Sequence, residues 1–222
     1  MRTEFHHRLD ELAADLARMC AQAGDAIENA TRALLQADLE AAEGVLTQLS
    51  DSTTLNKQVE HDAFQLLALQ APVAADLRAV VGALQTAADA DRMTGLAAHV
   101  ARIVRRRHPA QVLPEEVQGH FTEMGLVAVA MARSAQEVVL SGDVAQATQI
   151  LRDDETMNGL HRHLFTIVMG ADWRHGVSSA VDLVLLGRFY ERFADHAVAI
   201  ARRVVFQITG SKLSDEGTEA ID

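Results

Sequence analysis

The chain has 222 residues, of which 49% are hydrophobic and 4% aromatic, with only 13 Gly and 3 Pro. This composition excludes a disordered chain and favours long helices packed through small aliphatic side chains, and Cys20 as the only cysteine excludes an internal disulfide framework. The 31 acidic residues against 20 Lys and Arg give a net charge of −11, which argues against nucleic acid and anionic membranes as direct partners. Apolar runs such as 125–132 are shorter than the ~20 residues of a membrane span, and no signal peptide is recognisable. We therefore expect a cytoplasmic protein that meets membranes only through its partners.

The predicted elements are six long helices. Apolar residues recur at helical spacing between the few Pro and Gly residues, and Asp38 and Asp143 stand where N-caps of the second and fifth helices would be. The polar residues 211–222 are expected to form a flexible tail. In chain order, the predicted helices span 5–36, 39–69, 73–107, 115–140, 144–169 and 173–208.

The order of these helices indicates an internal duplication. The segment 34–38 resembles 139–143, and 91–102 resembles 191–202. Chance similarity between Ala-rich helices is the alternative explanation. We predict an all-α fold of two pseudo-symmetric three-helix bundles, one over residues 1–108 and the other over 115–210.

Acidic residues interrupt the apolar rows of both repeats. Glu191 and Asp195 lie four residues apart and therefore on one helix face, and Asp154 begins a similar pair on the preceding helix. The first repeat offers only Asp91, because Gly95 stands at the second acidic position. Clustered carboxylates suit Mg, Mn, Ca or iron better than zinc. We expect any oxygen-ligand site to be stronger in the second repeat.

A structural interpretation competes with the metal site. Arg188 and Arg192 adjoin the second-repeat acids, so the same residues could form a solvated face of Glu–Arg and Asp–Arg pairs. We expect His196 to be a structural histidine rather than a ligand. The arginines at 105–107 are expected to interact with the helix macrodipole at the end of the third helix.

The segments Asp89–Gly95 and Arg188–His196 resemble the repeated acidic signature of the PhoU family, and the resemblance extends over roughly residues 5–208. It implies an all-α fold of two three-helix bundles, a homodimer, and multinuclear metal sites at the Glu/Asp-x-x-x-Asp positions. Iron is the metal that the family most often implies, with zinc, magnesium or manganese also possible. Carried over to this chain, the ligands are Glu191, Asp195 and Asp91, and Asp154 is our addition from spacing.

The resemblance also implies a function. A PhoU-like protein is a negative regulator of phosphate uptake and phosphate-starvation signalling, and it acts as an adaptor between the ATPase of the phosphate ABC transporter and a sensor histidine kinase. No catalysis is implied. The alternatives are a metal-dependent helical enzyme that uses Glu191, Asp195 and Asp154, and a purely structural helical scaffold.

Overall fold

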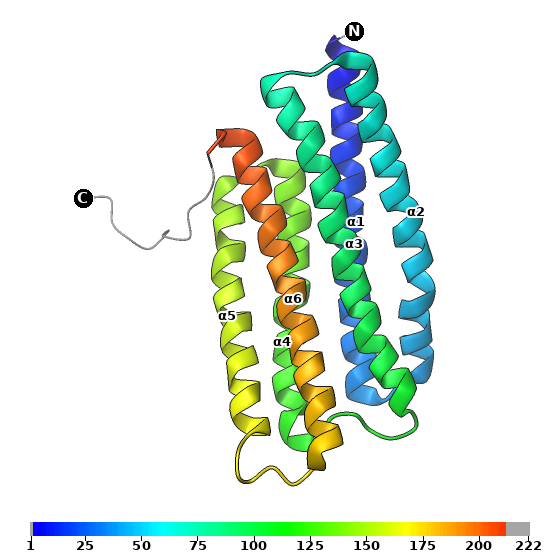
Figure 1. Ribbon diagram of the computed structural model, residues 1–222, viewed down its shortest axis with the longest axis vertical. Helices are drawn as coiled ribbons and strands as arrows, with labels where there is room; N and C mark the ends of the chain where they lie inside the picture. Colours follow the sequence, from blue (N-terminus) through cyan, green and yellow to red (C-terminus); the bar gives the residue numbers. More distant parts are fainter. Residues whose placement is uncertain (1, 212–222) are drawn as a thin grey trace, which may run out of the picture.

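The computed structural model describes residues 2–211, and the predicted tail therefore lies outside the described residues except for Ser211. Within residues 2–211 the chain forms helices and no strand, which confirms the predicted all-α fold (Figure 1). The helices are α1 (Arg2–Gln36), α2 (Leu39–Gln70), α3 (Ala74–Arg107), α4 (Glu115–Ser141), α5 (Val144–Val168) and α6 (Gly176–Thr209).

The six helices pack as two groups of three that share a long interface. Helices α1, α2 and α3 contact one another, as do α4, α5 and α6, while α1 packs on α4 and α3 packs on α6 across the interface. The turn between α2 and α3 lies at the upper end of the molecule and the turn between α5 and α6 at the lower end (Figure 1). The two groups are thus related by an approximate two-fold axis. The exact domain boundaries at 108 and 115 stay a prediction.

Local side-chain chemistry explains where the helices begin. The Oδ1 atom of Asp38 accepts a hydrogen bond from the Ala41 amide at 3.0 Å, and Asp143 accepts one from Ala145 at 2.7 Å. Both residues therefore act as the predicted N-caps. The last helix begins at Gly176 instead of at the predicted residue 173, because Gly176 has a positive φ of 75°, which a right-handed helix continuing from residue 173 does not adopt. The Trp173 indole donates to the Gly176 carbonyl at 3.0 Å.

A nearly continuous core fills the space between the helices. Tyr190 of α6 is fully buried there, and its hydroxyl forms a hydrogen bond of 2.7 Å with Thr31 of α1. Helices α1 and α4 approach so closely that a Cβ atom at Gly125 would lie 2.5 Å from the Thr31 side chain. Small residues therefore set the distance between the two helix groups.

A half-buried ion-pair network joins α3 to α6. The carboxylate of Asp89 accepts hydrogen bonds from His196 at 2.8 Å and from Arg203 at 2.6 Å. Burial raises the pKa of Asp89, but the hydrogen bonds from His196 and then Arg203 outweigh burial and leave this pKa below its usual value. His196 thus has the structural role that its sequence position indicated.

A second ion-pair network joins the same two helices at their other end. Asp182 of α6 is a buried carboxylate, and Arg106 and Arg107 from the last turn of α3 donate to it at 2.8 and 2.6 Å. The helix macrodipole was therefore an incomplete explanation for these arginines. Their partner lies in the other repeat, and they hold the start of α6 against the end of α3.

Helix α4 is both long and apolar. By length and composition alone, it is the one described helix that meets the criteria for a membrane span, although it contains Glu123 and Arg133. It packs against α1, α5 and α6, and its buried residues belong to the common core. The core helix of a bundle has the same composition, so this feature is weak evidence for a span.

Candidate functional site

Asp154 of α5 lies near Glu191 and Asp195 of α6, although the three side chains do not converge as metal ligands would. Burial raises the pKa of Asp154, and the nearby carboxylates of Asp195 and Glu191 raise it further. The Oδ2 atom of Asp154 accepts a hydrogen bond from Asn158 at 2.8 Å, whereas Oδ1 is buried without a partner among the described residues. The packing of α5 against α6 therefore forms an acidic cluster of Asp154, Glu191 and Asp195, an approach that the spacing allowed but could not fix.

Two of these acids are already paired with arginines. Arg188 donates to Glu191 at 2.6 Å, and Arg192 donates to Asp195 at 3.2 Å. Burial still raises the pKa of Glu191, and Asp195 adds to this effect. The structure thus contains the competing Glu–Arg and Asp–Arg pairs next to the half-buried Asp154.

Asp91 does not join this cluster. It lies on α3, where burial raises its pKa and the carboxylate of Glu60 on α2 raises it further. Its Oδ1 atom is buried without a hydrogen-bond partner in the described part of the chain. Asp91 is therefore a separate acidic position in the first repeat.

The donor chemistry of the α5–α6 cluster fits a metal only in part. Carboxylates and an amide oxygen are ligands for hard or borderline cations, and the orphan Oδ1 of Asp154 offers a free lone pair. Within residues 2–211, however, no three Asp, Glu, His or Cys side chains converge as metal ligands would. A metal bound here would have to draw Glu191 and Asp195 away from Arg188 and Arg192.

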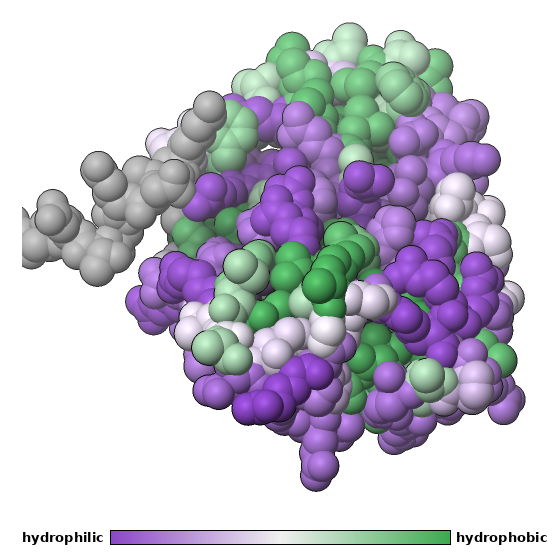
Figure 2. Space-filling model, turned by 60° about the horizontal axis from the view of Figure 1, so that its bottom comes forward, coloured by the Kyte–Doolittle hydropathy of each residue, from purple (hydrophilic) through white to green (hydrophobic). Residues whose placement is uncertain are grey.

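An exposed apolar surface at the lower end of the molecule was not predicted. We call it the lower apolar surface, and it consists of Phe165 of α5 and Met169 directly after that helix, together with Val177, Val181 and Leu185 of α6. The α6 residues follow at intervals of four and form one stripe. Figure 2, which turns the lower end forward, shows hydrophobic residues gathered between hydrophilic margins.

The lower apolar surface contains a groove of about 590 Å³. Val168 and Met169 form its α5 side, Trp173 comes from the connecting loop, and Val177 and Leu185 belong to its α6 side. Groups of exposed apolar side chains of this kind typically mark contacts with partners.

The first repeat carries an equivalent surface at the opposite end. This upper apolar surface consists of exposed residues at the end of α2 and the start of α3, with the same intervals of four along α3. An alignment of the two repeats would have revealed part of the correspondence, because Leu77 and Val81 match Val177 and Val181, whereas Gln85 stands where the second repeat has Leu185. The residues of the upper apolar surface are Phe64, Leu69, Val73, Leu77 and Val81.

This duplicated helical architecture, with acids repeated on α3 and α6, defines a two-repeat helical-bundle protein. The PhoU domain family matches the chain twice, over residues 16–104 and 121–204. The chain therefore belongs to the PhoU family.

Named relatives support this assignment along almost the whole chain. A Mycobacterium tuberculosis protein, phosphate-specific transport system accessory protein PhoU homolog 2, is 60% identical over 95% of this chain and 99% of its own length. The Mycobacterium leprae PhoU homolog 1 is 58% identical over 97% of both chains. Phosphate transport is thus the process to which this family belongs.

Solved structures show the same fold at lower sequence identity. The crystal structure of PhoU from Pseudomonas aeruginosa matches 93% of this chain and all of its own, with a TM-score of 0.82 and 22% identity. The phosphate transport system regulatory protein PhoU from Streptococcus pneumoniae matches 95% of this chain and 99% of its own, with a TM-score of 0.85 and 24% identity. These likenesses concern the fold alone.

Proposed function

We propose that this protein is a non-enzymatic negative regulator of phosphate uptake and of phosphate-starvation signalling. It acts in the cytoplasm, as a homodimer, and forms an adaptor between the ATPase of the phosphate transporter and a sensor histidine kinase. The names of its relatives support a role in the phosphate transport system.

The observation that carries the adaptor proposal is the pair of apolar surfaces. An adaptor needs two contact regions that can be occupied at the same time. The upper apolar surface lies beside the α2–α3 turn and the lower one beside the α5–α6 turn, and these two turns are at opposite ends of the molecule (Figure 1). Large apolar side chains that are exposed in the free protein contribute the most binding free energy when a partner covers them.

The two apolar surfaces each supply one variant for a binding test. Val177 is 80% exposed at the start of α6, and Val73 is 73% exposed just before the start of α3. A glutamate at either position remains in solvent next to a helix N-terminus, which tolerates negative charge. Val177→Glu and Val73→Glu should therefore fold normally and disrupt one surface each. Leu126→Glu is the control, because Leu126 is an exposed apolar residue of α4 outside both surfaces.

The assay is pull-down of the purified transporter ATPase and of the cytoplasmic part of the kinase at high and low phosphate. We expect binding by the wild type at high phosphate, and a loss of about tenfold or more for one partner with each surface variant. Leu126→Glu should bind both partners normally. Equal binding by all variants would contradict the use of these surfaces.

A metal cluster at Glu191, Asp195 and Asp154 is part of the proposal, with iron as the first candidate from the family resemblance and zinc, magnesium or manganese as the others. The orphan oxygen of Asp154 supports it. Elemental analysis of the purified protein and of Asp195→Ala tests it directly, since a real cluster must be lost from the variant.

The raised pKa of Asp154 is also typical of catalytic carboxylates. A phosphatase or oxidase activity that disappears in Asp195→Ala would favour the enzyme instead.

A further inference from the structure

The lower apolar surface is bordered by positive charge, although the chain as a whole is acidic. In residues 156–190, which contain most of this surface, three arginines stand against two aspartates, a net charge of +1 compared with −11 for the chain. One of the two acids, Asp182, is buried and already accepts hydrogen bonds from Arg106 and Arg107, which leaves Asp172 as the exposed acid of the segment. We call the three arginines the basic margin, and they are Arg162, Arg174 and Arg188.

Each arginine of the basic margin lies next to an apolar residue of the groove or of the surface. Arg162 precedes Phe165 by three residues on α5, and Arg188 follows Leu185 by three on α6, so each stands on the same helix face as its apolar neighbour. The arginine of the connecting loop directly follows Trp173, which lines the groove. All three side chains are exposed. Arg188 is paired with an acid of its own helix, whereas the other two form no ion pair in the described part of the chain.

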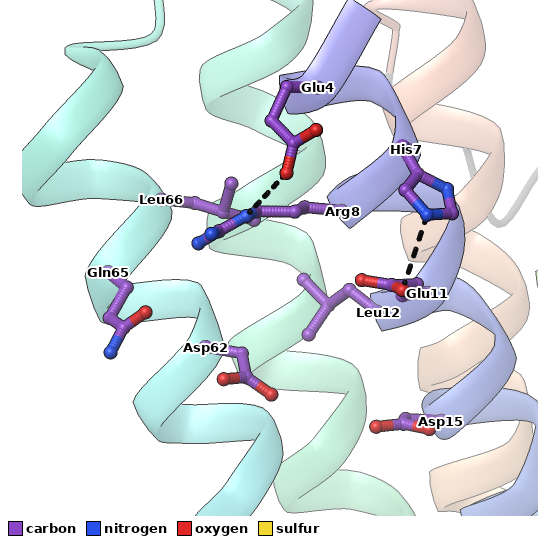
Figure 3. Close-up of a pocket in the computed structure, with 9 residues that line it drawn as sticks. All are labelled: Glu4, His7, Arg8, Glu11, Leu12, Asp15, Asp62, Gln65 and Leu66. Carbon is purple, nitrogen blue, oxygen red and sulfur yellow. Dashed lines mark ion pairs between the residues drawn. The ribbon is translucent and has the colours of Figure 1, made fainter.

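The upper end of the molecule has the opposite charge. In the segment 56–90 of the first repeat, two basic residues stand against four acids, a net charge of −2. A hollow of about 350 Å³ between the start of α1 and the end of α2 gathers further acids around a single arginine (Figure 3). That arginine, Arg8, is already paired with Glu4 at 3.5 Å. The two ends therefore differ in charge, even though both expose apolar side chains.

The shape of the lower apolar surface fits a helix. Its groove of about 590 Å³ lies between the end of α5 and the start of α6. Val177, Val181 and Leu185 follow at intervals of four along α6 and span about 12 Å at about 1.5 Å per residue, which is about two turns of a docked helix. An apolar groove between helices receives the apolar face of an amphipathic helix, whose anchoring residues recur at i, i+3, i+4 and i+7.

Arginines beside apolar side chains would also attract an anionic membrane surface. The groove favours a protein segment instead, because a flat bilayer that rests on a concave surface leaves the floor of the groove uncovered. The net charge of −11 adds repulsion between the rest of the chain and an anionic bilayer. A short acidic segment meets the basic margin without bringing a large negative surface towards the rest of the protein.

From these observations we infer that the lower apolar surface docks an acidic amphipathic helix of a protein partner. The apolar face of this helix covers the groove together with Val181 and Leu185, and its acids face the basic margin. The inference rests on the proposed use of the surface as a partner contact, and it adds the chemistry of the partner. It also assigns different partners to the two apolar surfaces, because the acidic upper end repels such a helix.

The only tryptophan of the chain provides a direct probe of this docking, because Trp173 lines the groove. The test uses a synthetic peptide of about 18 residues without tryptophan, with Leu at positions i, i+3, i+4 and i+7 and with Glu and Ala at the others. A twin peptide has Lys in place of every Glu, so that it has the same apolar face and the opposite charge. Docking of either peptide on the full-length protein shifts the Trp173 emission to shorter wavelength, and a titration gives the Kd.

We expect the acidic peptide to bind about tenfold or more tightly than its twin at low salt, and the difference to shrink as salt screens the exposed charges. Val177→Glu should abolish binding, whereas Val73→Glu on the upper apolar surface should leave the Kd unchanged. Arg162→Gln combined with Arg174→Gln should weaken binding of the acidic peptide about fivefold or more. Arg8→Gln is the matched control, because it removes an exposed arginine at the upper end and should not change the Kd.

Four results would overturn the inference. They are equal affinity for the two peptides, unchanged binding in Val177→Glu, a Trp173 shift with phosphatidylglycerol vesicles but not with the acidic peptide, and a dimer that Val177→Glu converts to a monomer, since a second copy would then cover the surface. The peptide test does not depend on the identity of the natural partners. A failed pull-down of the transporter ATPase and the kinase therefore contradicts the proposed function alone, whereas equal peptide affinities contradict this inference alone.

Discussion

Replacement of Asp182 by asparagine removes the charge that holds the end of α3 to the start of α6. The Asp182 side chain is 6% exposed, and its two oxygens accept from Arg106 at 2.8 Å and from Arg107 at 2.6 Å. An asparagine has nearly the same shape, but it offers one acceptor oxygen instead of two and carries no charge. The substitution therefore tests electrostatics and hydrogen bonding with little change in packing.

The expected cost follows from the exposure of the partners. Hydrogen bonds to a charged group are worth about 1.5–3 kcal/mol each. Arg106 is 61% exposed and Arg107 37%, so water replaces part of what they lose. We expect Asp182→Asn to lower the free energy of unfolding by about 2 kcal/mol. The converse change, Arg106→Gln with Arg107→Gln, leaves a buried carboxylate without a cation and should cost more, about 3–5 kcal/mol.

Urea unfolding at pH 7 measures both variants. Glu123→Gln is the control, because Glu123 is an exposed acid of α4 and its replacement should change the free energy of unfolding by less than about 0.5 kcal/mol. The argument fails if Asp182→Asn is as stable as this control. It also fails if loss of the carboxylate costs more than loss of both arginines.

Two pH-linked predictions concern other carboxylates. Burial raises the pKa of folded Asp154, so its stabilising contribution at low pH is lost as pH rises through that value. Asp154→Asn should therefore raise the Tm of metal-free protein at pH 7, measured by calorimetry, and an unchanged or lower Tm would contradict this. The pKa of folded Asp89 lies below its ordinary 3.8, so its contribution is present above that value and lost as pH falls further. Asp89→Asn should cost about 1–2 kcal/mol at pH 7 and less at pH 3 in urea titrations, whereas an equal cost at both values would refute the assignment.

The helices and their starts were largely predictable because they depend on local chemistry. Periodic apolar residues and the N-caps Asp38 and Asp143 act within a few residues of the helix that they define. The loop before α6 was not predicted. It depends on the positive φ of Gly176 and on a hydrogen bond from the Trp173 indole to the Gly176 carbonyl. The 3.6-residue periodicity of a helix contains no information about either feature.

Periodicity also cannot distinguish a core face from a second apolar face. Leu77, Val80 and Val81 form one apolar run in the sequence, yet only Val80 is buried and the other two are exposed. The exposed positions recur in the second repeat as Val177 and Val181. Comparison of the repeats was thus the available signal for the apolar surfaces.

The spacing of the acids on each helix was visible in the sequence, whereas their approach across helices depends on a packing register that the sequence does not fix. Asp154 approaches Glu191 and Asp195 because α5 and α6 are consecutive antiparallel helices. The contact between Arg106 and Asp182 joins residues far apart in the chain, and it requires the register of α3 against α6, which no local pattern determines.

Expression of phosphate-starvation genes in phosphate-rich medium tests the regulatory function most directly. The host strain would lack this gene and any second copy of it, and it would be complemented with the wild type, Val177→Glu or Leu126→Glu. The account predicts derepression in the deletion strain, repression by the wild type and by Leu126→Glu, and continued derepression with Val177→Glu. Normal repression in the deletion strain would contradict it.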